Sequence, residues 1–130
     1  MIRCKRAYSP VEAADGARVL VDRLWPRGCR KADLLLDAWL RELAPSAALR
    51  QAFGHEPQRF AEFGAAYRAE LAAHPERWQP LLQLARQGPL TLLYAARDEQ
   101  YNNARVLAAF LAEQLAAADG GVQKRSLGPR

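Results

Sequence analysis

The residues best suited to chemistry directly follow the apolar run 19–21, and they are Asp22, Arg23, Trp25 and Arg27. The carboxylate of Asp22 can act as a general acid or base. Two neighbouring guanidiniums can each hold a phosphate or carboxylate through paired hydrogen bonds, and an indole can pack against a ring. This grouping predicts a site for a small anionic ligand that is phosphorylated or nucleotide-like.

A second polar segment follows another apolar run, at 90–95. Its candidate site residues are Tyr94, Arg97, Asp98, Asn102 and Asn103. Asp98 is a second candidate acid or base, and Arg97 adds a third guanidinium. A helix that begins near Asn102 would present free backbone amides, which favour an anion. The segment therefore offers ligand-binding groups of the same kind as the first one.

The two polar segments meet only if the strands before them run parallel. In a parallel sheet the carboxyl ends of the strands share one edge, where α/β proteins bind their ligands. We therefore expect the turns after both strands to open onto one cavity. Structural interpretations stay open: Asp22 can pair with Arg23 or Arg97 to tie the loops together. Likewise, Trp25 can fill the core and Asn102 can cap the helix.

The fold predicted from the apolar pattern is α/β, a small three-layer arrangement with about five helices. Its sheet is short and mainly parallel, with three strands at about 2–7, 17–22 and 90–95. Helical spacing and Pro, Gly and Ser boundary signals place the helices at 32–43, 46–53, 57–73, 75–87 and 102–120. The direction of the first strand pairing stays open, because the connection is short for a parallel crossover. Residues 1–118 are expected to form a single domain, and 119–130 a flexible basic tail.

The formal net charge of +5 is concentrated near the first two strands. Residues 1–31 hold eight basic and three acidic side chains, and the tail is also basic. Such a surface suits phosphate or nucleic acid. No aromatic interleaving or recognition helix accompanies it, so a nucleic-acid-binding or regulatory module ranks below the small-ligand site. A structural or interaction domain without catalysis is the third alternative.

Several common signatures of chemistry are absent from the sequence, among them a Gly-rich phosphate loop, a nucleophile elbow and an HExxH motif. The two histidines and two cysteines lack metal-ligand spacing, so neither a metal nor another cofactor is predicted. No apolar run reaches the roughly 20 residues that cross a membrane, and reduced cysteines are expected, which favours the cytoplasm. Whether the chain is an enzyme and how many copies assemble stay open.

The sequence also contains, in this order, VDRLWPRG at 21–28, ELAPS at 42–46, FGH at 53–55, LLYAA at 92–96 and NNA at 102–104. These segments resemble the YeaO-like family (domain of unknown function 488), and the resemblance covers about residues 2–116. It implies a small α/β fold and brings no established reaction. Longer members carry a cysteine and a glutamate after the last strand and Cys-His-Arg at the next helix start. Since this chain has neither, the resemblance argues against thiol-dependent chemistry, and it places His55 at the edge of the site.

Overall fold

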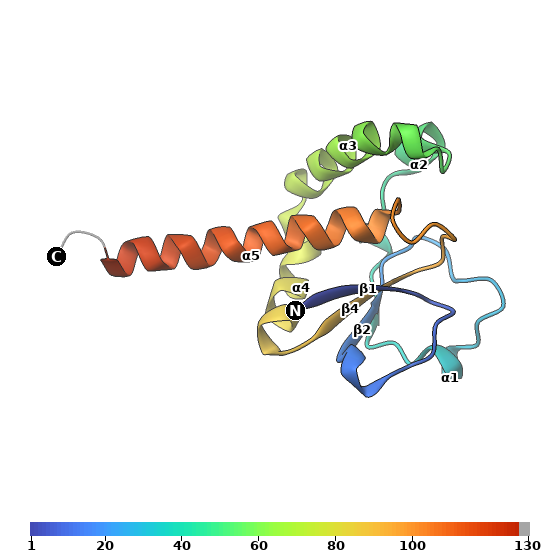
Figure 1. The fold of residues 1–130 in the computed structure, drawn as a ribbon, viewed down its shortest axis with the longest axis horizontal. Coiled ribbons are helices and arrows are strands. Elements are labelled where there is room, and N and C mark those ends of the chain that lie inside the picture. The colour runs from blue at the N-terminus through green and yellow to red at the C-terminus, as the bar shows by residue number, and fades with distance from the viewer. Residues whose placement is uncertain (128–130) are drawn as a thin grey trace.

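The computed structural model describes residues 1–127, with side chains for residues 1–118. In this part of the chain four strands form one all-parallel sheet in the order β1-β4-β2-β3 (Figure 1). The strands are β1 (Ile2–Arg6), β2 (Ala17–Leu20), β3 (Ala38–Trp39) and β4 (Leu90–Tyr94). The α/β class and the three predicted strands are confirmed, and the first pairing is resolved, because β1 and β2 both run parallel to β4 between them.

The central strand β4 is buried along its whole length, which explains why its sequence is a nearly continuous apolar run. Successive residues of the sheet face two separate cores. One core contains Val19, Leu90 and Leu92 and receives apolar side chains from four helices. The other contains Leu20 and Leu93 and is covered by a short helix and a long loop. The helical layer is therefore thick on one face and thin on the other.

The helices of the thick layer are α2 (Ala47–Phe53), α3 (Phe60–Ala73), α4 (Pro75–Gln87) and α5 (Asn103–Leu127). The thin face carries α1 (Lys31–Leu34), and the 3₁₀ turns are η1 (Ala13–Asp15), η2 (Arg41–Leu43) and η3 (Pro57–Arg59). Local signals set the boundaries of α2. The Oγ of Ser46 accepts a hydrogen bond from the Leu49 amide at 3.2 Å, and Gly54 ends the helix in the left-handed conformation.

The single helix predicted for 32–43 is wrong. Helix α1 ends at Leu34, Leu35 has a left-handed φ of 48°, and the chain then enters β3 beside β2. Both Nε and Nη2 of Arg18 donate hydrogen bonds to the Leu34 carbonyl, at 3.2 and 2.9 Å. The Leu34 carbonyl therefore accepts hydrogen bonds from a side chain, and this tertiary contact competes with extension of the helix beyond Leu34. The leucine spacing alone could not reveal that competition.

Helix α5 begins at Asn103, as expected, but continues to Leu127 instead of ending at the glycine pair at 120–121. A glycine inside a helix is unfavourable by about 1 kcal/mol relative to alanine, which is too little to terminate a long helix by itself. Residues 128–130 of the predicted flexible tail lie outside the described residues, as do the side chains from 119 onward, so its flexibility stays a prediction. Within residues 1–127, none of the helices has the apolar length that a bilayer crossing requires.

Candidate ligand-binding site

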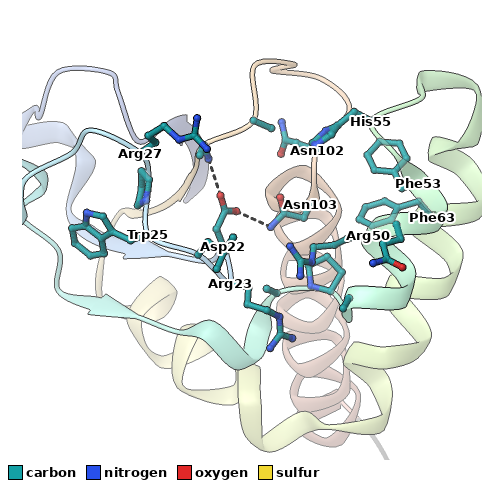
Figure 2. A pocket seen from close by; sticks show the side chains of 18 of the residues that line it. Asp22, Arg23, Trp25, Arg27, Arg50, Phe53, His55, Phe63, Asn102 and Asn103 are labelled. Carbon is teal, nitrogen blue, oxygen red and sulfur yellow. Dashed lines mark hydrogen bonds between the residues drawn. The ribbon is translucent and has the colours of Figure 1, made fainter.

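A pocket of about 700 Å³ opens at the carboxyl edge of the sheet, as Figure 2 shows. Its walls come from the loop after β2, the loop after β4, the first residues of α5, and helices α2 and α3. The turns after both strands therefore do share one cavity. This location follows from the parallel pairing of β2 with β4, which brings their carboxyl ends together.

Asp22 lies in the middle of this pocket and joins its two sides. Its Oδ2 accepts a hydrogen bond from the Ala95 amide at 2.9 Å, and its Oδ1 accepts one from Nδ2 of Asn103 at 3.2 Å. Burial raises the pKa of Asp22 above its ordinary value, while these two hydrogen bonds and the nearby Arg50 and His55 partly oppose that rise. The structural interpretation, in which Asp22 pairs with Arg23 or Arg97, is wrong for the described residues, because Asp22 ties the two loops together through the Ala95 amide and Asn103 instead.

Three guanidiniums line the same pocket, those of Arg23, Arg27 and Arg50. All three residues are exposed, and within the described part of the chain none of these guanidiniums donates a hydrogen bond or joins an ion pair. Arg23 and Arg27 extend to opposite sides of Asp22 (Figure 2). The pocket therefore offers cationic donors at separate places along its length, because these two side chains do not converge on one point.

Local backbone structure presents these cations. After Arg27 the chain turns at Gly28, whose φ of 81° is disfavoured for residues with a side chain. The Tyr8 hydroxyl donates a hydrogen bond to the Arg27 carbonyl at 2.9 Å, which ties the loop to the end of the first strand. Arg50 projects from the last turn of α2, a helix held at both ends by its caps. Arg27 and Arg50 thus extend from backbone segments that are held in place by hydrogen bonds.

Aromatic side chains form much of the apolar wall. The rings of Phe53 and Phe63 are stacked with their centroids 4.5 Å apart, and both residues are buried. The Nε1 of Trp25 donates to the Cys29 carbonyl at 2.7 Å, and its ring meets Trp39 edge-on at 5.3 Å. Trp25 accordingly packs against the second core and also lines the pocket, while its role in packing against a ligand ring stays a prediction.

His55 stands at the rim in an unusual conformation. It has a φ of 58°, directly after Gly54 with a φ of 54°, and its ring centroid lies 6.0 Å from that of Phe53. A non-glycine residue in the left-handed region is uncommon, and such residues collect at functional sites. The resemblance-based expectation for His55 agrees with its position, because it lines the pocket.

The pocket brings together six residues predicted from the sequence, namely Asp22, Arg23, Trp25, Arg27, Asn102 and Asn103. Asn102 also caps α5, since its Oδ1 accepts from the Arg105 amide at 3.0 Å. Tyr94, Arg97 and Asp98 do not line the pocket. Tyr94 packs in the core, Arg97 is exposed on the loop, and the Asp98 carboxylate accepts two backbone amides of its own loop at 2.9 Å. The catalytic roles predicted for Asp22 and Asp98 stay predictions.

Sequence reasoning missed the contribution of α2 and α3, which is Arg50, Phe53 and Phe63. These helices read as ordinary core helices because their apolar spacing dominates the pattern. The available signal was the resemblance, because the segments that carry it include Phe53-Gly54-His55.

The side chains that line the pocket determine which chemistry it can support. Neither cysteine lines the pocket, and burial raises the pKa of the Cys4 thiol to about 11, so it stays protonated at neutral pH. Across the described residues, no group of three histidine, cysteine or carboxylate side chains is placed to hold a metal ion. The arrangement combines cationic donors, one desolvated carboxyl group and an aromatic wall.

Comparisons with known proteins identify the family of the chain. A family model described as the inactive DUF488-N3 subclade matches residues 1–128. The chain is 51% identical over 110 residues to the uncharacterized protein YeaO of Escherichia coli K12, covering 85% of this chain and 96% of YeaO. It is 40% identical over 113 residues to the uncharacterized protein Rv3073c of Mycobacterium tuberculosis H37Rv, covering 85% of this chain and 92% of that protein. No solved structure gives a significant match. The chain therefore belongs to the YeaO-like DUF488 family, in its inactive N3 subclade.

Proposed function

We propose that this protein binds a small anionic, nucleotide-like ligand in the pocket around Asp22 and does not transform it. The observation that carries the proposal is the set of three pocket guanidiniums, Arg23, Arg27 and Arg50, that have no hydrogen-bonded partner among the described residues. A guanidinium is well suited to a phosphate, because its fork of donors matches two phosphate oxygens. An anionic ligand gives these donors the partner that they lack within the protein.

The rest of the pocket supports a ligand with a ring. Phe53, Phe63 and Trp25 provide apolar and aromatic surface beside the cations. The carboxyl group of Asp22 retains acceptor capacity beyond its two hydrogen bonds, since each carboxylate oxygen can accept more than one. A nucleobase offers a flat face for the aromatic wall and N–H donors for this carboxyl group. A pocket of about 700 Å³ is within the usual size range for a small-molecule site.

Binding without turnover is supported by the chemistry and by the family. No cysteine lines the pocket, and Asp98, the second predicted acid or base, lies outside it. The matching family model describes its subclade as inactive. The remaining candidate, Asp22, is held by Ala95 and Asn103, which suits a recognition group.

The test measures binding of AMP, GMP, CMP and UMP by isothermal titration calorimetry. We expect at least one to bind the wild type and to bind Arg27→Ala and Arg50→Ala about tenfold more weakly, because each variant loses a charge-assisted hydrogen bond. Arg86→Ala is the matched control, since Arg86 is exposed on α4 and does not line the pocket. Nucleotide at 100 times its Kd should stabilise the fold by about 2.7 kcal/mol.

Two results would contradict the proposal. The first is that none of the four nucleotides binds the wild type. The second is that Arg86→Ala weakens binding as much as Arg27→Ala does, which would indicate unspecific attraction to a basic protein. Slow hydrolysis of the bound nucleotide, monitored by ³¹P NMR, would overturn the claim that the ligand is left intact.

A further inference from the structure

A second pocket, of about 440 Å³, adjoins the first one. Arg23 and Ala44 line both pockets, so the two cavities share a wall at the end of β2. Figure 2 shows Arg23 extending away from Arg27, on the other side of Asp22. Arg23 is therefore placed between the pockets instead of beside the other cations of the first pocket.

The second pocket also has a cationic character. Its ionisable lining residues are Arg23, Arg77, His74 and Glu70, so two guanidiniums accompany one carboxylate. The carboxylate of Glu70 accepts hydrogen bonds from the Ser46 amide at 3.0 Å and from the Ser46 hydroxyl at 2.6 Å. Glu70 is thereby turned toward the start of α2, while Arg23 has no hydrogen-bonded partner in the part of the chain that the structure describes.

Arg77 is only weakly engaged by the protein. Its Nε lies 4.0 Å from a carboxylate oxygen of Glu76, at the outer limit for an ion pair, and both side chains are exposed. Exposed pairs of this kind contribute little to stability, so the guanidinium can turn toward a ligand at small cost. Arg77 lines the second pocket and Arg27 lines the first, with Arg23 on the shared wall.

We propose that the two pockets together hold a linear 5′-phosphorylated dinucleotide, which names the ligand class of the proposed function and rests on it. The 5′-terminal nucleotide occupies the pocket around Asp22, the internucleotide phosphate lies between Arg23 and Arg77, which both line the second pocket, and the second nucleoside enters that pocket. A 5′-phosphorylated dinucleotide supplies two phosphates separated by a sugar, and it adds a second nucleoside that can occupy the second pocket. Cations in separate adjoining cavities need that separation, which a nucleoside diphosphate lacks.

The test compares the 5′-phosphorylated dinucleotides pApA, pGpG, pCpC and pUpU with the corresponding mononucleotides, by calorimetry on the full chain. We expect the preferred dinucleotide to bind at least tenfold more tightly than its mononucleotide. Arg77→Ala should weaken dinucleotide binding about tenfold and leave mononucleotide binding unchanged, whereas Arg27→Ala should weaken both. Arg86→Ala, on the same helix but outside both pockets, should change neither.

The outcomes separate this inference from the proposed function. If mononucleotides bind and depend on Arg27, while dinucleotides bind no more tightly or are insensitive to Arg77→Ala, the inference is wrong and the proposed function stands. If neither ligand binds, both are wrong. If Arg86→Ala weakens the dinucleotide as much as Arg77→Ala does, the second pocket is not the site and the contact is a general attraction of nucleic acid to the basic surface. Thermal unfolding of every variant checks that the fold is intact.

Discussion

Two acid and arginine clusters lie at opposite ends of β2, and they use the same residue types differently. At the start of the strand, Asp15 and Arg18 form an ion pair at 2.6 Å with exposed side-chain fractions of 0% and 4%. Lys5 reaches the other oxygen of Asp15 at 2.9 Å, and Arg18 also donates to the Leu34 carbonyl. Asp15, Arg18 and Lys5 all form ion pairs or hydrogen bonds within the protein, so this cluster has a structural role.

Beyond the end of the same strand, the cluster around Asp22 is left open. Asp22 is held by the Ala95 amide and the Asn103 side chain, and the neighbouring Arg23 and Arg27 lie on opposite sides of it (Figure 2). Its cations face a cavity. The comparison indicates that position on the sheet determines whether acidic and arginine side chains pair with each other or face a cavity, since the carboxyl edge of a parallel sheet is where ligands bind.

The largest difference between the two clusters should appear in stability. Asp15→Ala leaves Arg18 buried without its carboxylate, and breaking a buried pair from one side costs about 3–5 kcal/mol of unfolding free energy. Asp22→Ala removes only a partly buried acceptor, whose own desolvation already disfavours its charged form, so its loss should be clearly smaller. Urea denaturation followed by circular dichroism gives both values. Equal losses would show that the pocket cluster is as structural as the other one.

The two carboxylates should also respond to pH with opposite signs. Burial by itself would raise the pKa of Asp15, but hydrogen bonds from Lys5, the Glu12 amide and Arg18 outweigh it and lower that pKa. Asp15 therefore contributes stability above its unfolded pKa, and this contribution is lost as the pH falls through its folded pKa. For Asp22 the folded pKa is raised, so its contribution is present below the unfolded pKa and is lost as the pH rises through the folded pKa.

Comparing wild type with Asp15→Asn and with Asp22→Asn between about pH 3 and 7 isolates each contribution. Relative to Asp15→Asn, the wild type should gain unfolding free energy as the pH rises. Relative to Asp22→Asn, it should lose unfolding free energy over the same change. Urea midpoints at several pH values measure both differences. Parallel curves for the two variants would contradict the distinction between a satisfied and a desolvated carboxylate.

The sequence predicted the parts of the fold that depend on local pattern. The apolar run at 90–95 was the clearest strand signal in the sequence, and Ser46 and Gly54 marked the ends of α2. It failed at 32–43, where leucines at helical spacing gave way to β3 because Arg18 engages the Leu34 carbonyl. A contact between residues far apart in the chain leaves no periodic signal.

The site was predictable to the same degree. Parallel strand ends brought Asp22 and Asn103 together, because that step needs only the strand direction. Arg97 and Asp98 were assigned to the pocket by their nearness to Tyr94 in sequence, but the loop after β4 places them elsewhere. Arg50 was missed because its arrival at the pocket depends on how α2 packs over the sheet edge. Side-chain direction and helix packing are tertiary properties that spacing does not encode.

The smallest change in unfolding free energy is expected for the three pocket arginines, and it tests directly whether they lack partners within the protein. Arg23→Ala, Arg27→Ala and Arg50→Ala should each change the unfolding free energy by no more than about 0.5 kcal/mol in the absence of ligand, because exposed side chains without partners contribute little. Arg18→Ala, at the start of β2, is the contrasting variant and should lose several times more unfolding free energy, because it leaves Asp15 buried without its guanidinium partner. Urea denaturation measures all four. A loss above about 1.5 kcal/mol for any pocket arginine would mean that it is a structural partner in solution, and the cations would then not be free for a ligand.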